Sequence, residues 1–592
     1  MTSMNASIIV SGNDTPATKG RAINLVPAAF LVIAFLWLPL ITTVIDSLQT
    51  PTGWSLANYR QLAGETFPKI LLATVGDSAG VTALCILLGV PTAYTLSRME
   101  GRLVPVLLFA LTIPLFVSSL IRSYSWVAIL GNRGLLNQTF LALGLIERPI
   151  KMAYTQTGMF AAMVQVQLPL FVLPAYSVMR RVDPRVRRAA QSLGADPITA
   201  FFTVFLPLAL PGIGVASLLV FIGSLGFFET PALLGPPGAY LVSQSIEVRV
   251  NSLGDQAGAA AQAIALLVLT LGLLGIAALA RNLTSKQKDR RRVIGRTSLL
   301  ARPLGSLARM IAPWRWLVVG SLAAAVVILT VLPLVILVPL SFSAASYLSF
   351  PPNTFSFRWF EAYVATPEWM HGTLLSIQFA AMAAAIATVA GGLSVLNLDA
   401  LPRSLRSTAL LMGTAPLVIS PMVLSVSIFY IVARLGLIGS PLAFIGTYAL
   451  MGLPFPVLII GAALTKLDPA LNRAAASLGA RPVAILTTVT LPLLSAAVAS
   501  AFLFAFVVGF NDLSVSLFLS SGTSRTLPLL MWDDVRQEIT PRLAAVSVVV
   551  LLAGTTFWAV STTLRKALAW TKTHLLLRTV QSVPQFKART IQ

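Results

Sequence analysis

The stretch VDPRVRRAAQSLGADPITAFFTVFLPLALPGI, residues 182–213, occurs a second time as LDPALNRAAASLGARPVAILTTVTLPLLSAAV, residues 467–498. The two copies lie 285 positions apart throughout and align without a gap. Outside this block the two halves of the chain are only weakly alike. The repeated block therefore indicates a duplicated architecture, in which one local structure is needed twice.

Each copy is expected to form a short helix, a turn and a second short helix. Asp183 and Asp468 can cap the first helix, because each precedes a proline that suits the first helical position. Gly194 and Gly479 then end that helix, as glycine commonly does. We interpret the two copies as docking loops. The alternative is an ordinary amphipathic loop, which would not need to occur twice in register.

The composition of the chain indicates a membrane protein. Of its 592 residues, 56% are hydrophobic and only 10% are charged, whereas soluble domains carry about 25% charged residues. Twelve apolar runs are close to the roughly 20 residues that span a bilayer, and helices satisfy their own backbone there. The predicted spans are 23–45, 70–97, 103–125, 153–178, 206–228, 259–280, 316–343, 372–398, 407–432, 443–465, 491–511 and 543–564.

The net charge is +22, and the distribution of this charge between the loops predicts how the chain is oriented in the membrane. With the N-terminus inside, most of the Lys and Arg residues fall in loops on the inner side, as the positive-inside rule requires. Both termini are then cytoplasmic, and both docking loops lie on the cytoplasmic side between the fourth and fifth spans of their half. Nucleic-acid binding is the other interpretation of such a charge, and this asymmetry disfavours it.

A basic segment divides the chain into two sets of six spans. Residues 281–315 carry ten Lys and Arg but one acid, Asp289, and are typical of a solvated tether. Because six is even, the halves are parallel, related by an axis along the membrane normal. The predicted organisation is a cytoplasmic tail at 1–22, a membrane domain at 23–280, the linker at 281–315, a second membrane domain at 316–564 and a basic cytoplasmic tail at 565–592.

Little material for catalysis is present. The chain has one cysteine and two histidines, which disfavours a disulfide framework, a metal site or acid–base chemistry. A G-x-x-x-x-G-K-[ST] phosphate loop does not occur in the sequence. We therefore predict a protein that is not an enzyme and needs no cofactor.

The repeated block resembles the EAA loop of binding-protein-dependent importer permeases, the membrane subunits of ATP-binding-cassette importers. That consensus runs E-A-A, three residues, Gly, nine residues, Ile, one residue, Leu-Pro. The acid is replaced by arginine in both copies, and the isoleucine by valine. The matching positions are Arg188, Ala189, Ala190, Gly194, Leu206 and Pro207, then Arg473, Ala474, Ala475, Gly479, Leu491 and Pro492.

This resemblance implies an all-α architecture like that of type I importers, with two permease domains fused in one chain. It also implies coupling helices that sit on a separate dimer of ATP-hydrolysing subunits, and a periplasmic binding protein that delivers the solute. Residues 120–138, 226–235 and 510–532 further resemble spermidine/putrescine-type permeases. The implied solute is a polyamine. Ferric iron and other small organic solutes are the alternatives within this class.

Polar residues in or beside the spans are candidates for contact with the solute, because they are costly in a membrane. Asp77 lies in the second span, where a helix-interface role is the alternative. Gln165 and Gln167 point about 200° apart on a helix, so at most one faces a pathway. Glu229 follows the fifth span and Asn511-Asp512 the eleventh; carboxylates there suit a cationic solute, but they can equally cap helices at the outer interface.

Two other classes of protein remain as rivals. A twelve-helix secondary transporter also has two parallel halves, but it would use intramembrane acids, of which only Asp77 is clear, and would need no repeated docking loop. A membrane enzyme would need a catalytic cluster that the sequence does not offer.

Overall fold

The fold was analysed in a computed structural model that describes residues 23–50, 53–64, 66–286, 315–396, 398 and 401–552. The elements of the first half are η1 (Ile23–Leu25), α2 (Val26–Val32), η2 (Ile33–Trp37), α3 (Leu38–Leu48), β1 (Gln49–Thr50), β2 (Gly53–Trp54), α4 (Ala57–Leu62), α5 (Thr66–Arg98), α6 (Leu103–Thr112), η3 (Ile113–Phe116), α7 (Ser119–Leu130), α8 (Leu135–Ala142), α9 (Gln156–Arg181), α10 (Pro184–Ser192), α11 (Pro197–Ala200), η4 (Phe201–Phe205), α12 (Leu206–Leu225), α13 (Glu229–Leu234), α14 (Val242–Asn251) and α15 (Gln256–Lys286).

The second half begins after the linker. Its elements are α17 (Arg315–Ser341), α18 (Arg358–Ala365), α19 (Pro367–Leu396), α20 (Arg403–Thr414), η6 (Ala415–Leu417), α21 (Pro421–Arg434), α22 (Pro441–Gly452), α23 (Pro454–Leu464), α24 (Pro469–Ser477), α25 (Pro482–Ile485), η7 (Leu486–Thr490), α26 (Leu491–Asn511), α27 (Ser514–Leu519), α28 (Leu527–Gln537) and a helix at Arg542–Leu552.

The chain is an all-α polytopic membrane protein, as predicted. Within the described residues, nine helices are long and apolar enough to cross a membrane, or up to eleven if each of two bent pairs forms one span. The predicted twelfth span, 543–564, is described only as far as Leu552. The tails 1–22 and 565–592 and residues 287–314 of the linker lie outside the described residues.

Two of the predicted spans are not continuous helices. Within 103–125 the chain bends by 102° between Phe116 and Ser119, and within 407–432 it bends by 95° between Leu417 and Pro421. At the first bend Val117 and Ser118 have ψ 133° and 140°, and no proline follows either of them. A proline explains the second bend, because it lacks the N–H that continues a helix and biases the preceding residue toward extended backbone. Ser420 accordingly has ψ 134° before Pro421. Apolar composition alone did not reveal these breaks.

The order of elements in the first half is repeated in the second. Helices α5, α9 and α12 pack on one another, as do their counterparts α19, the α22–α23 pair and α26. The short pair α10–α11 follows the fourth span of its half, and α24–α25 occupies the same place in the second half. The short helices α13 and α14 likewise recur as α27 and α28.

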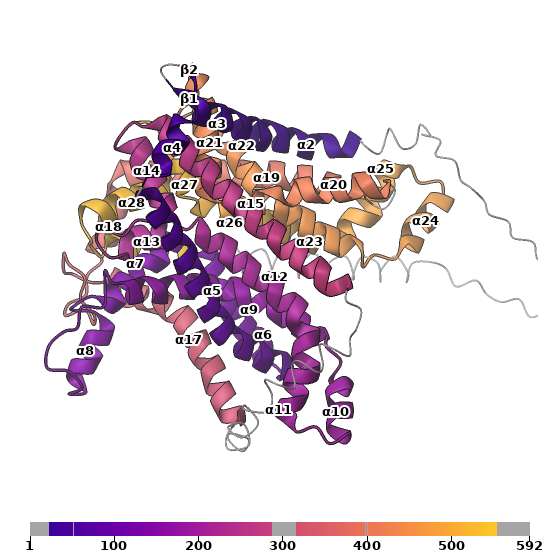
Figure 1. The fold of residues 1–592 in the computed structure, drawn as a ribbon, viewed down its shortest axis with the longest axis horizontal. Helices are drawn as coiled ribbons and strands as arrows, with labels where there is room; N and C mark the ends of the chain where they lie inside the picture. Colours follow the sequence, from indigo (N-terminus) through magenta and orange to yellow (C-terminus); the bar gives the residue numbers. More distant parts are fainter. Residues whose placement is uncertain are drawn as a thin grey trace, which may run out of the picture.

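The first span of each half packs against the opposite half. Helix α17 lies on α5, α6, α7 and α9, whereas α2 and α3 contact α19, α21 and α22. Figure 1 shows α17 beside the magenta and purple helices and α2 along α19. The two halves are therefore interlocked rather than merely adjacent.

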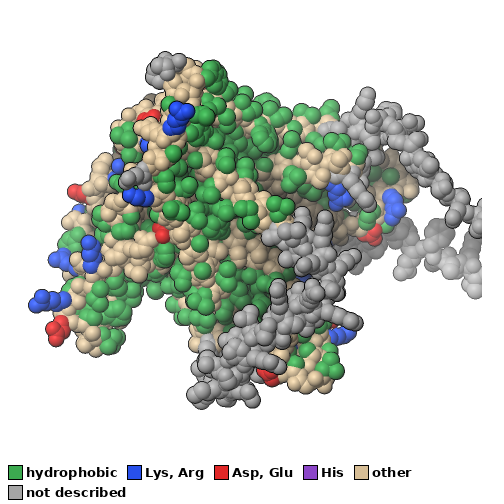
Figure 2. Space-filling view, viewed as in Figure 1, with side chains coloured by type: hydrophobic (Ala, Val, Ile, Leu, Met, Phe, Trp, Pro, Cys, Tyr) green, Lys and Arg blue, Asp and Glu red, His purple; other side chains and the backbone are tan. Residues whose placement is uncertain are grey.

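Figure 1 places α10–α11 and α24–α25 at one end of the molecule and the short helices α8, α13, α18 and α28 toward the other. Figure 2 shows hydrophobic side chains over much of the helical surface between these ends, with the coloured Lys, Arg, Asp and Glu side chains gathered near the ends. This distribution suits helices that face hydrocarbon along their length.

Candidate functional site

Both repeated blocks begin with a capped helix. The Asp183 carboxylate accepts the backbone N–H of Arg185, and the Asp468 carboxylate accepts that of Ala470, each at 2.8 Å. Pro184 and Pro469 occupy the first helical position, where the missing N–H costs nothing. The predicted N-caps are thus confirmed, and α10 and α24 start in the same way.

Both helices also end in the same way. Gly194 has φ +90° and Gly479 has φ +83°, in the left-handed region that glycine adopts without a steric penalty. Ala195 N–H bonds to the Ala190 carbonyl and Ala480 N–H to the Ala475 carbonyl, each at 3.1 Å. This Schellman closure reverses the chain immediately after the helix.

A widened helical turn follows each loop at the start of the fifth span. The Leu206 N–H bonds to the Phe201 carbonyl, five residues back, and Leu491 bonds to Leu486 in the same way. The next residues are Pro207 and Pro492, which have no N–H and would press on the carbonyl four residues earlier. The π-type turn gives that carbonyl room, so it explains how each Leu-Pro pair is accommodated inside a continuous helix.

The two loops present matching apolar side chains. No side chain of α10 or α24 is buried. Leu193 and its repeat counterpart Leu478 are each 89% exposed, and Val186 and its counterpart Leu471 are also exposed. Paired exposed apolar side chains are typical of a binding surface.

The loops differ in how they are attached to the spans. Arg187 of α10 donates to the Tyr94 hydroxyl of α5 at 2.9 Å, and Tyr94 packs edge-on against Phe201 and Phe205. The residue at the repeat position of Arg187 is Asn472, whose side chain instead accepts a hydrogen bond from Thr490 at 3.3 Å. The first loop is therefore held by a larger cluster than the second.

Two of the predicted pathway residues meet between the halves. Glu229 is the first residue of α13, and Asp512 follows α26; their carboxylates are close enough to interact electrostatically. Arg122 of α7 interacts electrostatically with Glu229 and donates to the Val166 carbonyl at 3.3 Å. Arg122 and Glu229 are buried, whereas Asp512 keeps some accessible surface.

Acidic groups outnumber basic ones in this cluster, with two carboxyls and one guanidinium. Removal from water raises the pKa of both the Glu229 and the Asp512 carboxyl, against the lowering effect of their hydrogen bonds. Asp512 accepts the Val515 N–H at 2.7 Å, so it caps α27, as the alternative interpretation proposed. With all three groups ionised, one arginine faces two carboxylates. A cation placed here would be stabilised by the uncompensated charge.

The other pathway candidates make hydrogen bonds between helices. Asp77 of α5 accepts a hydrogen bond from Gln156 of α9 at 2.7 Å. Gln165 donates to the Thr330 carbonyl of α17 at 2.9 Å, and Asn511 donates to the Phe116 carbonyl at 3.3 Å. These contacts favour structural roles for Asp77 and Gln165, whereas Asn511 joins the two halves beside Asp512.

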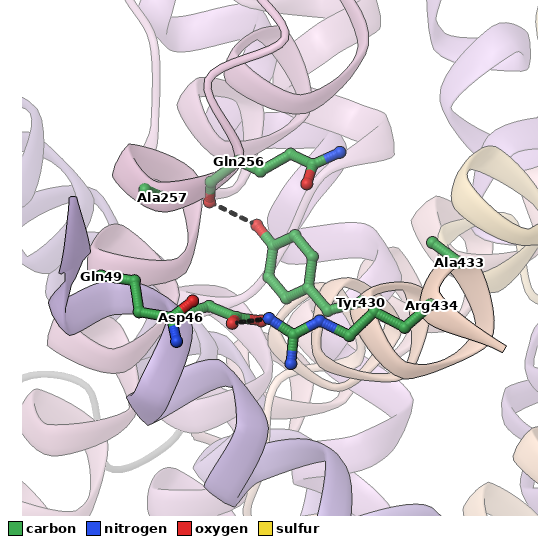
Figure 3. Close-up of a pocket in the computed structure, with 7 residues that line it drawn as sticks. All are labelled: Asp46, Gln49, Gln256, Ala257, Tyr430, Ala433 and Arg434. Carbon is green, nitrogen blue, oxygen red and sulfur yellow. Dashed lines mark hydrogen bonds and ion pairs between the residues drawn. The ribbon is translucent and has the colours of Figure 1, made fainter. Parts of the chain in front are cut away.

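A polar pocket of about 300 Å³ lies where the first span meets the second half. Figure 3 shows the Arg434 guanidinium paired with the Asp46 carboxylate, and the Tyr430 hydroxyl bonded to the Gln256 carbonyl at 2.7 Å. The lining residues are Asp46, Gln49, Gln256, Ala257, Tyr430, Ala433 and Arg434. This pocket is not predicted from the sequence, although Arg434, a charged residue just after a predicted span, was a usable signal.

The Asp46–Arg434 pair is expected to help hold the interlocked halves together. Asp46→Arg leaves two guanidiniums facing each other, so we expect it to destabilise the protein by about 1 kcal/mol, a modest value because Arg434 is half exposed. The charge-swapped double variant Asp46→Arg with Arg434→Asp should recover most of the loss. The melting temperature of the purified chain measures both effects, and an additive double variant would contradict the pairing.

In the described part of the chain, no group of three or more His, Cys, Asp or Glu residues is placed to hold a metal ion. Cys85 is buried. Burial of a lone thiol between helices gives it no partner for redox or metal chemistry.

Comparison with known proteins agrees with this geometry. The family described as "Binding-protein-dependent transport system inner membrane component" matches residues 85–286. The chain is 30% identical over 264 residues to the spermidine/putrescine transport system permease protein PotB of Salmonella typhimurium strain LT2, covering 43% of this chain and 92% of the relative.

Two further relatives show the breadth of the match. The PotB protein of Escherichia coli K12 is 32% identical over 221 residues, covering 37% of this chain and 80% of the relative. The molybdenum transport system permease protein ModB of Mycobacterium bovis is 31% identical over 252 residues, covering 42% and 90%. The chain belongs to the family of inner-membrane permease components of binding-protein-dependent ATP-binding-cassette importers.

Proposed function

We propose that this permease moves a small cationic solute, with a polyamine such as putrescine or spermidine as the best candidate, from the periplasm to the cytoplasm. Residues 23–280 and 316–564 act as two permease domains joined by the linker 281–315. Both termini lie in the cytoplasm. One chain thereby fills both membrane positions of the importer.

The observation that carries the cationic solute is the cluster of Glu229, Asp512 and Arg122 between the halves. Each carboxylate belongs to the segment that follows the fifth span of its half, so the two approach a common axis. One arginine faces two acids, so one negative charge is left for a bound cation. That charge compensates the cation for the water that it loses on entering the site. The similarity to PotB, whose name specifies spermidine and putrescine, supports the same solute class.

The repeated loops account for how transport is driven. We propose that a dimer of separate ATPase subunits docks on α10 and α24 through Leu193, Leu478 and the exposed face around them. Closure of the dimer moves the loops, and the continuous helical connections into α12 and α26 carry that motion to the pathway. The contributing positions are Arg188, Ala189, Ala190, Gly194, Leu206, Pro207, Arg473, Ala474, Ala475, Gly479, Leu491 and Pro492.

The opposite end of the bundle is where a periplasmic binding protein would deliver its solute. The family implies such a partner in general. The short helices α13, α14, α27 and α28 lie between the last residues of the fifth spans and the following span in each half. A solute released above them would meet Glu229 and Asp512 on its way into the bundle.

The similarity to ModB favours a second candidate, an importer for an oxyanion. Such a solute would need an excess of positive charge at the axis, and the described cluster has the opposite sign. Ferric iron and other small organic solutes remain alternatives within the importer class. Competition by these solutes in the assay below separates them from polyamines.

Uptake into proteoliposomes tests the proposal directly. The vesicles hold this chain with its ATPase subunits and binding protein, and ATP is enclosed on the side of the ATPase subunits. We expect accumulation of labelled putrescine or spermidine that requires this ATP and stops with a non-hydrolysable analogue. ATP-dependent assembly without polyamine uptake would retain the importer and reject the solute. Uptake driven by an ion gradient without ATP would reject the mechanism.

A further inference from the structure

Three arginines gather where the first docking loop meets the spans. Arg180 of α9 donates to the carbonyls of Ser97 at 2.9 Å and Met99 at 3.3 Å. The Arg98 guanidinium lies over the ring of Phe205, 4.7 Å from its centroid. Arg187 binds Tyr94, whose ring also faces Arg98. Arg180 and Arg187 thus both contact the end of α5, where Arg98 lies.

Several donors of this cluster have no partner. Nε and Nη2 of Arg98 and Nε of Arg187 are buried without a hydrogen bond. Arg187 and Arg180 both repel Arg98 electrostatically. Among the residues that the structure describes, no carboxylate forms an ion pair with any of the three. Buried polar groups are nearly always satisfied, so unpaired guanidinium donors point to an absent anion.

Phosphate fits these donors better than a single halide or hydroxide would. A guanidinium presents two parallel N–H groups that match two oxygens of one phosphate. The Arg98 guanidinium lies over the rings of Tyr94 and Phe205, which restricts the directions that its two N–H groups can take. Arg180 is exposed and the side chains of the other two are only partly covered, so the cluster lies at the surface although its unpaired nitrogens are covered by neighbouring atoms.

We propose that Arg98, Arg180 and Arg187 bind the phosphate of an anionic phospholipid headgroup. The cluster lies at the end of the spans, and α6, which starts five residues after Arg98, exposes Leu103 and Val106 for contact with acyl chains. Basic pockets between membrane helices on the cytoplasmic side are typical sites for cardiolipin and related headgroups. The location thus favours a lipid over a soluble phosphate.

The site belongs to the first loop alone. In the second loop Asn472 takes the position of Arg187 and bonds to Thr490. A phosphate shared by α5, α9 and α10 would fix the first docking helix to the bundle, so anionic lipid would strengthen transmission through that loop. This consequence rests on the docking role proposed above, whereas the lipid binding itself does not.

Native mass spectrometry of the full chain, released from phosphatidylcholine nanodiscs doped with cardiolipin, tests the site. We expect the double variant Arg98→Gln with Arg187→Gln to retain cardiolipin about tenfold less well, since charge-assisted hydrogen bonds are lost. Arg181→Gln is the matched control, because Arg181 is exposed at the same end and outside the cluster. Equal loss in the control, or no loss in the double variant, would overturn the proposal.

Further measurements distinguish a lipid phosphate from the other anions that could bind the three arginines. Arg98→Lys keeps the charge but not the fork, and should bind cardiolipin with intermediate strength while preserving the melting temperature. Displacement of cardiolipin by millimolar inorganic phosphate would show a soluble anion as the occupant instead. Displacement by the ATPase subunits, together with their weaker binding to the double variant in lipid-free detergent, would assign the site to a carboxylate of that partner. Either result rejects the lipid without affecting the solute proposal.

Discussion

Replacing both Gly194 and Gly479 by valine is expected to reduce ATP-driven uptake by at least about 100-fold while the chain stays folded. Each glycine holds a positive φ at the end of a docking helix, and a β-branched residue there costs about 1–3 kcal/mol of strain. A Cβ at either position would meet no atom within 4 Å. The expected damage therefore comes from the backbone conformation and not from a clash.

The strain acts on the part of each loop that is proposed to dock. Without the left-handed residue, the bonds from Ala195 to Ala190 and from Ala480 to Ala475 cannot close, so Leu193 and Leu478 lose their fixed direction. The ATPase subunits should co-purify less well with the double variant, and their ATP hydrolysis should no longer respond to the binding protein. Single variants should retain part of the activity, because one loop remains intact.

Gly144→Val provides the matched control for the glycine variants. Gly144 also has a positive φ, +66°, and open space where a Cβ would lie, but it follows α8 at the end of the molecule away from the docking loops. Comparable strain there should leave coupling intact. A second control is Gly194→Asn with Gly479→Asn, because asparagine tolerates the left-handed region. Normal coupling in the valine variant would refute the docking role of the two loops.

The local structure of the two repeated loops was predictable because its determinants are local. Asp183, Pro184 and Gly194 act within one turn of the positions that they cap or close, and their repetition 285 residues later makes chance an unconvincing explanation. The π-type turn before Pro207 was not predicted, although the proline that causes it is visible in the sequence. Capping and turn residues predict where these short helices begin and end, but they do not predict every distortion within a helix.

The long-range features could not be predicted in the same way. Glu229 and Asp512 lie 283 positions apart, close to the 285-residue offset of the repeat, so the sequence places them at equivalent positions of the two halves. That their carboxylates lie near each other depends on how the halves pack. The pairing of Asp46 with Arg434 depends on the first span lying against the opposite half. Asp77 had the strongest sequence signal as a mid-span acid, yet it bonds to Gln156 between two helices of the same half.

Neutralising Asp512 is expected to be the most damaging single change on the proposed pathway. Asp512→Asn preserves the size of the side chain and an oxygen that can still accept the Val515 N–H, since asparagine also caps helices well. What is lost is the negative charge that Arg122 does not compensate. A buried charge pair with a cationic solute is worth about 2–5 kcal/mol, so spermidine uptake should fall by about 30-fold or more.

Two other carboxyl variants show whether the loss of uptake is specific to the charge of Asp512. Glu229→Gln should cost less than Asp512→Asn, because Arg122 already interacts with Glu229 and offsets its charge. Asp77→Asn makes the same chemical change at a position bonded to Gln156, and should alter uptake by no more than about threefold. Measured rates of labelled spermidine uptake, at matched amounts of assembled importer, rank the three. An equal loss in all three variants would assign the effect to folding, whereas wild-type uptake by Asp512→Asn would mean that the solute is not attracted by this charge. The loss of uptake should therefore be largest for Asp512→Asn, smaller for Glu229→Gln and smallest for Asp77→Asn. This ranking is expected only if the cation passes the junction of α13 and α27.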